Sequence, residues 1–301
     1  MKRVQIDCKL SRLYTKAKFA LVLIALATLC SSAVAQEETA EDWFNKGQEL
    51  QRNDSHEEAL QAFDKAIEIN KSYAFAWGGK GYVLYNIGRY EEAIASWDRA
   101  IELEPDEFYS GSKWEMKGKV LEILGRNEES AQAYERALEL ADKAVTEYKT
   151  STDLNLSAAW GFKGQLLDEQ GRYVEALEAM ANSSRANPED AFAWAVMGDI
   201  LADRLGRYNE SIESYNKSLE IDPRNIGALR GEGYALASLG RYDEALNYYN
   251  RALKIDSRFA RAWQGLGDAL RNLGMYNESI QAYDRAIAEM PQQPRYALIG
   301  K

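Results

Sequence analysis

The sequence repeats itself with a period near 34 residues from about residue 40 onward, and this period restricts the fold more than any other feature. One glycine marks each period, and the intervals between successive glycines are 34, 37, 46, 34, 35 and 34 residues, for Gly47, Gly81, Gly118, Gly164, Gly198, Gly233 and Gly267. Repeats of this length cannot bury their apolar faces alone, so neighbouring copies must stack on one another. The chain is therefore expected to form a solenoid of stacked units.

Each period contains two helical segments separated by a turn. In the clearest copy, Trp77, Gly81 and Leu84 share one segment, and Ala93, Trp97 and Ala100 share the next. Glycine breaks the pattern between the segments, and proline after the second segment ends it. The same turn recurs along the chain as Gly88-Arg89-Tyr90, Gly171-Arg172-Tyr173, Gly206-Arg207-Tyr208 and Gly240-Arg241-Tyr242, with Gly274-Met275-Tyr276 as a variant.

A small–large–small pattern in the second segment predicts how the two helices pack. The small positions are all Ala or Ser and lie seven residues apart, as in Ala245 and Ala252. Between them comes a large residue, at Phe63, Trp97, Tyr134, Met180, Tyr215, Tyr249 and Tyr283. Intervals of four and three place all three positions on one helical face. We expect the repeat glycine to oppose the small residues, so that the two backbones approach closely there.

These residues resemble the tetratricopeptide repeat (TPR) over nearly the whole chain after residue 40. The resemblance implies an all-α, right-handed superhelical solenoid of antiparallel helix pairs, with the first helices lining the inner groove. It gives seven repeats within residues 40–294, namely 40–73, 74–107, 111–144, 157–190, 191–225, 226–259 and 260–293. Residues 295–301 are then a C-terminal tail too short to form a capping helix, which would leave Ile280, Tyr283 and Ile287 partly uncovered.

Two stretches depart from the regular spacing. Three extra residues, Phe108, Tyr109 and Ser110, separate the second and third repeats. A longer insertion covers residues 145–156, where residues 141–149 can continue the preceding helix and residues 150–153 form a loop and a helix cap. Two interpretations remain open for this insertion: a tolerated surface loop, or a lip beside the groove that contacts a ligand through Tyr148 and Lys149.

The first 35 residues have the three parts of a secretory signal. Six basic residues and one acid precede residue 19, an apolar run extends from Phe19 to Cys30, and Ala33-Val34-Ala35 forms a cleavage motif. The apolar run is shorter than the roughly 20 residues that a membrane span needs. We expect cleavage after Ala35 and a secreted or extracytoplasmic protein, with an uncleaved N-terminal anchor as the alternative and the only contact with a membrane.

Composition excludes several functions. Residues 36–301 carry 31 bases against 46 acids, a balance that disfavours binding to nucleic acid or to an anionic membrane surface. Both cysteines, Cys8 and Cys30, precede residue 36, and His56 is the single histidine. Cysteine nucleophiles and Cys/His metal sites are therefore ruled out of the repeats. The six early tryptophans and most prolines have places in the repeat pattern, so we expect no enzyme activity, no metal and no cofactor.

The inward face of the first helices supplies the candidate binding residues, because positions three and four apart share one side of a helix. The second repeat offers aromatic residues, the fourth and fifth offer acids, and the last two offer arginines. The candidates are Phe75, Tyr82, Tyr85, Asn86, Gln165, Asp168, Phe192, Asp199, Arg230, Tyr234, Arg261, Gln264 and Arg271. The pattern suggests a polarised groove, with an aromatic and acidic central part for basic or apolar segments and an arginine-rich end for a carboxylate.

The resemblance implies a binding function, because such repeats generally bind peptides or protein partners. We expect a non-catalytic interaction scaffold that holds a peptide or protein partner in its concave groove outside the cytoplasm. The alternative is a structural component of an envelope or surface complex that acts by self-association into a homo-oligomer. The fold alone does not choose between them.

Overall fold

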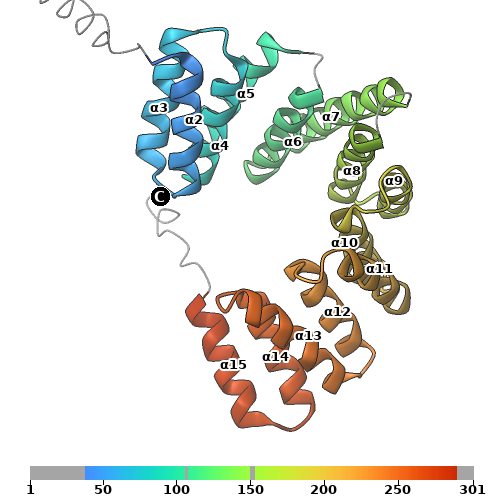
Figure 1. Cartoon of the computed structure of the whole chain (residues 1–301). Helices are drawn as coiled ribbons and strands as arrows, with labels where there is room; N and C mark the ends of the chain where they lie inside the picture. The colour runs from blue at the N-terminus through green and yellow to red at the C-terminus, as the bar shows by residue number, and fades with distance from the viewer. Residues whose placement is uncertain (1–37, 106–107, 150–152, 290–301) are drawn as a thin grey trace, which may run out of the picture. The chain divides into compact units, whose positions relative to one another are not determined.

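The computed structural model describes residues 38–105, 108–149 and 153–289, and the expected N-terminal signal and C-terminal tail lie outside them. The described residues form helices and no strand (Figure 1). The helices are α2 (Ala40–Arg52), α3 (His56–Ile69), α4 (Ala74–Asn86), α5 (Tyr90–Leu103), α6 (Phe108–Ile123), α7 (Asn127–Tyr148), α8 (Asp153–Glu169), α9 (Tyr173–Ala186), α10 (Ala191–Asp199), α11 (Tyr208–Ile221), α12 (Ile226–Ser238), α13 (Tyr242–Ile255), α14 (Ala260–Asn272) and α15 (Tyr276–Glu289). A π-helical turn, η1 (Ile200–Arg204), continues α10.

The chain divides into two compact units, one up to residue 89 and one from residue 90 onward. Within the described residues, the first unit holds α2, α3 and α4, and the second holds α5 to α15. In each unit a helix packs against the next helix along the chain, and first helices of neighbouring repeats also touch, as α2 does with α4 and α12 with α14. The all-α architecture of paired, stacked helices predicted by the period is thus observed.

The Gly-Arg-Tyr turns reverse the chain between the two helices of a repeat. Gly171 has φ +73°, a left-handed conformation that glycine adopts without steric cost. The next residue, Arg172, precedes the second helix, and its guanidinium binds Glu175 through Nε at 2.8 Å. The pair fixes the first turn of the helix, where a carboxylate also meets the positive end of the helix dipole. The same arginine–glutamate pair forms at residues 126 and 129, 207 and 210, and 241 and 244.

The repeat glycines contact small residues of the second helix, as expected, and they also make room for its large residue. A Cβ atom on Gly198 would lie 2.4 Å from Tyr215 Cε1, and one on Gly231 would lie 2.4 Å from Tyr215 Cζ. Tyr215 thus lies between glycines of two successive first helices and is fully buried. Phe63 lies in the same way between Gly47 and Gly79. The large side chain therefore joins one repeat to the next.

Small residues of the second helix bind the backbone of the first helix. Ser130 Oγ donates a hydrogen bond to the carbonyl of Gly118 at 2.9 Å, and Ser279 Oγ donates one to the carbonyl of Gly267 at 2.8 Å. Both serines are buried, so these bonds satisfy polar groups that would otherwise be costly to enclose. Close approach of the helices does occur at these positions, but it is a serine hydroxyl that meets the glycine backbone.

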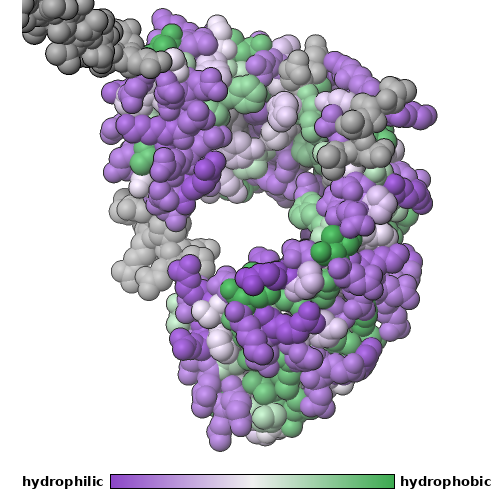
Figure 2. All heavy atoms as spheres, viewed as in Figure 1, coloured by the Kyte–Doolittle hydropathy of each residue, from purple (hydrophilic) through white to green (hydrophobic). Residues whose placement is uncertain are grey.

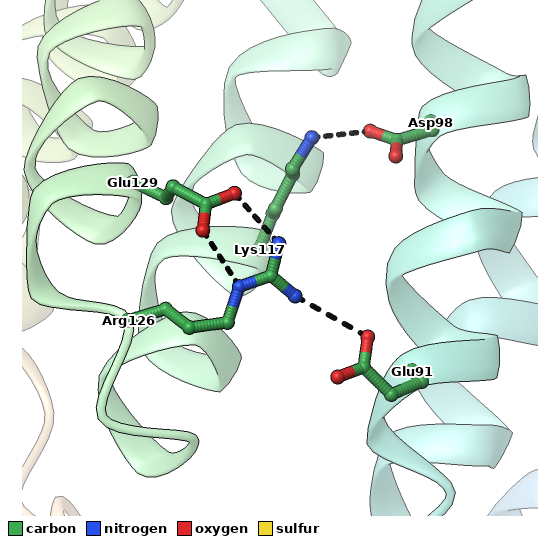
Figure 3. Close-up of polar contacts among 5 residues, drawn as sticks. All are labelled: Glu91, Asp98, Lys117, Arg126 and Glu129. Atoms are coloured by element: carbon green, nitrogen blue, oxygen red, sulfur yellow. Dashed lines mark hydrogen bonds and ion pairs between the residues drawn. The ribbon is translucent and has the colours of Figure 1, made fainter.

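Ion pairs connect successive repeats. Lys117 Nζ lies 2.5 Å from Asp98 Oδ1 on the preceding repeat, and Arg126 joins Glu91 at 3.3 Å while holding Glu129 (Figure 3). Lys80–Asp64 and Lys163–Asp142 are equivalent contacts at 2.6 and 2.5 Å. These lysines also lie near the indole of their own helix; Lys117 Nζ, for example, is 5.0 Å from the centre of the Trp114 ring. The repeats are thus tied together by charge as well as by apolar packing.

The two irregular stretches extend helices. The three extra residues, Phe108, Tyr109 and Ser110, form the first turn of α6. Helix α7 continues through residues 141–148, and α8 begins at Asp153, while residues 150–152 of the expected loop and cap lie outside the described part. Of the helices in the described ranges, none combines the length and the apolar character that a membrane crossing requires.

The surface is mainly hydrophilic. On the face drawn in Figure 2, purple residues predominate, and green hydrophobic residues form smaller patches between them, one of them over α10. Exposed apolar side chains include Phe192 on α10 and, on the last described helix, Ile280 and Ile287. Single exposed apolar residues are common on proteins, whereas clusters mark interaction sites. Whether these residues belong to an interaction site therefore depends on the side chains around them.

Candidate binding groove of the first helices

First helices of the second unit line two adjoining cavities. The cavities share Gln165 on α8 and Phe192 on α10, so they adjoin one another. One has a volume of about 340 Å³ and the other about 420 Å³. Volumes of this size are within the range of ligand pockets. We call the first the apolar cavity and the second the charged cavity.

The charged cavity brings together side chains from five helices. It contains six of the residues predicted from the inward face of the first helices: Gln165, Asp168, Phe192, Asp199, Arg230 and Arg261. Its complete lining is Glu115, Lys119, Gln165, Asp168, Glu169, Phe192, Val196, Asp199, Ile200, Asp203, Arg204, Arg230 and Arg261. Five carboxylates thus face four cations, and the arrangement can bind a polar segment by charge.

Most of these charges are already paired with one another. Lys119 Nζ lies 2.6 Å from Glu115 and 2.7 Å from Glu169. Burial alone would lower the pKa of Lys119, but the hydrogen bonds to the two glutamates outweigh burial and raise it. Arg204 Nε lies 3.1 Å from Asp168 Oδ1, one repeat earlier. Among the lining residues, all within the described ranges, Asp203 and Arg261 form no ion pair and are exposed.

Asp199 is the centre of a network that links the groove to the core. It accepts a hydrogen bond from Tyr215 Oη at 2.8 Å and one from Arg230 at 3.1 Å. Desolvation raises the pKa of Asp199, and the charge of Arg230 and the bond from Tyr215 offset part of that effect. Arg230 therefore stabilises a carboxylate of its own chain. Its predicted role as a free cation for a ligand carboxylate is not available in this geometry.

The apolar cavity is lined by aromatic rings. Phe108 meets Phe162 edge to face, with ring centres 5.6 Å apart, and it meets Tyr148 at 6.2 Å. Phe192 completes the wall with 55% of its surface exposed. The polar groups at its base bond to one another: Ser157 and Ser183 hydroxyls are 3.0 Å apart. The full lining is Phe108, Tyr109, Ser112, Ser157, Ala158, Gly161, Phe162, Gln165, Ser183, Asp190, Phe192 and Ala193.

The π-turn η1 lies on the wall of the charged cavity. The turn glycine Gly206 comes eight positions after Gly198. In the other repeats that have both glycines the interval is seven positions, as from Gly164 to Gly171. The helix absorbs the additional residue as a π-turn, and Ile200, Asp203 and Arg204 of this turn line the cavity. Such turns occur often at functional sites. Here the turn supplies two of the charges in the groove.

The predicted residues of the second repeat lie in the other unit. Phe75, Tyr82, Tyr85 and Asn86 are on α4, and Phe75 is 42% exposed. The ring of Phe75 is 6.3 Å from Phe44 and 6.0 Å from Tyr73, so it belongs to an aromatic cluster of the first unit. This cluster is a separate candidate surface.

The remaining predicted residues lie on α12 and α14. Tyr234 is 37% exposed and packs edge to face on Tyr208 at 6.1 Å. Arg271 lies 3.4 Å from Asp268 on the same helix, and Gln264 is exposed. The expected arginine-rich end therefore keeps one arginine without an ion pair within the described residues, Arg261.

Several lining residues were not among the predicted ones. Glu115 and Lys119 occupy the inward positions of the third repeat, whose first helix was passed over, although their spacing of four was visible in the sequence. Phe162 stands two residues before the repeat glycine, where Gly79, Gly231 and Gly265 stand in other repeats. Large residues also stand there in the third and fifth repeats, as Met116 and Val196, so the sequence did not single out Phe162.

Metal and histidine chemistry find no support in this groove. Among the described residues, no three His, Cys, Asp or Glu side chains are placed to hold a metal ion together. His56 is the first residue of α3, and its Nδ1 is buried without a hydrogen-bond partner in the described structure. It lies next to the turn between α2 and α3.

Family models identify the repeats. Four models, each described as tetratricopeptide repeat, match residues 236–301, 189–258, 74–107, and 40–73 together with 114–144. Together these matches span more than half of the chain. The protein therefore belongs to the tetratricopeptide repeat family. A search of curated protein sequences gives no significant match.

Solved structures with similar folds include two with descriptive titles. The crystal structure of MamA matches with a TM-score of 0.47 and 16% identity, covering 54% of this chain and 92% of that one. The crystal structure of YrrB, described as a TPR protein with an unusual peptide-binding site, matches with a TM-score of 0.41 and 20% identity, covering 78% of this chain and 95% of that one.

Proposed function

We propose that this protein is a non-catalytic scaffold of seven repeats that binds an extended segment of a partner protein in the groove of its second unit. One observation carries the proposal: six predicted inward-facing residues converge on one cavity that adjoins an aromatic-lined one. Membership of the tetratricopeptide repeat family supports a protein-binding role. The exposed Phe192, shared by both cavities, is the natural point of contact.

Aromatic and arginine residues most often dominate the energy of an interface, and both types are present here. The charges that line the groove favour specificity and fast association more than affinity, because most of them already have partners. The apolar cavity, by contrast, contributes to affinity, because the transfer of an apolar side chain from water into the cavity is favourable. A partner segment would therefore be held by an apolar contact and selected by charge.

Site-specific photocrosslinking in the source cells tests this function. A photoreactive phenylalanine at Phe192 should form covalent adducts with a defined peptide of one partner protein. The matched control is Val174 on α9, which is 73% exposed but lies on a second helix outside both cavities. Equal adducts at both positions, or adducts at Val174 alone, would show that the groove is not the binding site.

Self-association is the second candidate, and the last described helix favours it. Ile280 and Ile287 on α15 are 58% and 68% exposed. A second copy that covers them would form a homo-oligomer. Light scattering after size exclusion should then show a mass that increases with concentration and that Ile280→Lys with Ile287→Lys returns to the monomer. A monomer at all concentrations would reject this function.

For location, we propose export from the cytoplasm, supported by the basic flank, apolar run and Ala-x-Ala motif of residues 1–35. N-terminal sequencing of the extracytoplasmic fraction should find Gln36 as the first residue. A cytoplasmic protein that begins at Met1 would overturn this proposal without affecting the binding function.

A further inference from the structure

The irregularities of the repeat array meet at one place. The added turn of α6 contributes Phe108, the extension of α7 contributes Tyr148, and both rings pack together at 6.2 Å. Phe162 stands where three other repeats have a glycine, and its ring packs on Gly111, where an added Cβ would come within 2.8 Å of it. Next to them, the additional residue of the fifth repeat forms η1. These departures from the regular repeat therefore line the two adjoining cavities.

We infer that this site recognises a partner segment with two chemical parts: an aromatic or branched aliphatic side chain, and a basic residue close to it. The apolar part enters the cavity walled by Phe108, Phe162 and Phe192, and the basic part pairs with Asp203 on η1. The inference rests on the binding function proposed above and specifies its ligand.

The apolar cavity favours an apolar side chain because Ser157, Ser183 and Asp190 in its wall are already hydrogen-bonded. Ser183 Oγ donates to the carbonyl of Ser157 at 2.8 Å, and the carboxylate of Asp190 accepts from the backbone N–H groups of Phe192 and Ala193. A polar ligand group that enters among the aromatic rings would lose its bonds to water. An aromatic ring, by contrast, would join Phe108 and Phe162, whose edge-to-face packing at 5.6 Å is typical of aromatic clusters.

Charge complementarity selects the second part. The charged cavity has five carboxylates and four cations, and the ion pairs leave Asp203 and Arg261 over, both exposed. The pKa of Asp199 is raised mainly by desolvation, and the negative charges of Asp203 and Asp168 raise it further. The three carboxylates therefore repel one another. A cation bound at Asp203 would relieve that repulsion. An acidic segment would increase it, and residues 36–301 as a whole carry excess negative charge.

A random dodecapeptide library displayed on phage, selected on the full chain, provides the probe. Enriched peptides should share an aromatic or aliphatic residue with Lys or Arg within a few positions. Ala158→Trp fills the apolar cavity from its exposed rim, and it should lower affinity for a selected peptide at least about tenfold. Its matched control is Ala131→Trp at an exposed position of α7 outside the cavities, which should leave affinity unchanged.

A second pair of variants tests the charge. Asp203→Asn should weaken binding of the basic peptide about threefold or more and reduce its salt dependence, whereas Asp243→Asn at an exposed position of α13 should do neither. Phe192→Ala opens the cavity on the exposed side, so it removes the contact without filling the space. It should weaken the same peptide, which keeps the test valid if Ala158→Trp disturbs the helix.

The possible outcomes distinguish failure of the ligand inference from failure of the proposed binding function. Peptides that need Phe192 yet lack an apolar residue, or that carry acids in place of a base, would overturn this inference and leave the groove as a binding site. Enriched peptides that bind equally well to Phe192→Ala, Ala158→Trp and Asp203→Asn, or a library that yields no enrichment, would overturn both the inference and the proposed function.

Discussion

Gly198→Ala should destabilise the second unit, although alanine normally favours a helix. Gly198 lies inside α10, where an added Cβ would be 2.4 Å from Tyr215 Cε1 and 2.6 Å from Cδ1. Carbon atoms in contact prefer about 3.5–4.0 Å, so the ring would have to move by about 1 Å. It has no space to do so, because Gly231 already touches its other side.

The size of the effect follows from three contributions. Overpacking of a filled core costs about 1–3 kcal/mol. Displacement of the Tyr215 ring also weakens its 2.8 Å hydrogen bond to Asp199, and a bond to a charged group contributes about 1.5–3 kcal/mol. Replacing glycine with alanine in a helix returns about 0.5–1 kcal/mol. We therefore expect a net loss of about 1–3 kcal/mol in the free energy of local unfolding.

Gly161→Ala is the matched control. It also lies inside a first helix, but its Cβ would be 3.5 Å from Ser183 Oγ, an ordinary contact. This variant should therefore be as stable as the wild type or more stable by up to about 1 kcal/mol. Hydrogen exchange measured by mass spectrometry should show faster exchange over α10, η1 and α11 in Gly198→Ala, with α2 to α4 unchanged, because damage in a solenoid stays near its origin. Equal stability of the two variants, or uniform loss of protection, would refute this account of the packing.

Four further variants test the charges. Glu232 is 2% exposed, and desolvation raises its pKa above the ordinary 4.5, although a hydrogen bond from Tyr248 lowers the pKa in part. Between pH 4.5 and the raised pKa the native state binds more protons than the unfolded state, so stability falls as the pH rises through this range. Glu232→Gln should therefore raise the midpoint of urea unfolding at neutral pH and flatten the pH dependence, whereas an unchanged profile would contradict the assignment. Arg230→Gln should lower stability by about 1 kcal/mol, a value discounted because Asp199 is 41% exposed, whereas Arg261→Gln should leave the thermal midpoint unchanged; equal effects would mean that Arg261 is paired as well. Lys117→Gln should cost less than about 1 kcal/mol, and the difference from wild type should shrink in 1 M salt, while a loss that salt does not reduce would point to packing in place of the ion pair.

The repeat pattern predicted the helices and the groove face because local spacing determines both. The large residue, its flanking small residues and the turn glycine recur at fixed intervals, and the helices lie where those intervals place them. The inward positions of α8, α10, α12 and α14 met in one cavity for the same reason. The sequence does not show that Tyr215 also enters between Gly198 and Gly231, because that contact depends on how two first helices stack.

The partners of the groove charges depend on contacts between distant residues. Arg204 reaches Asp168 across 36 positions of sequence, and Arg230 reaches Asp199 across 31. These distances follow from the stacking angle of whole helices, which no local pattern contains. The π-turn had a visible cause, the eight-residue interval from Gly198 to Gly206, but the sequence alone does not show whether a helix or a loop absorbs the additional residue.

Hydrogen exchange of the full chain with a selected peptide tests the central claim most directly, because it reports which helices the ligand covers. Binding in the groove predicts slower exchange in α8, in α10 with η1, and in α12, with little change in the second helices α9, α11 and α13. Slower exchange confined to α9, α11 and α13 would contradict the assignment of the groove as the binding site.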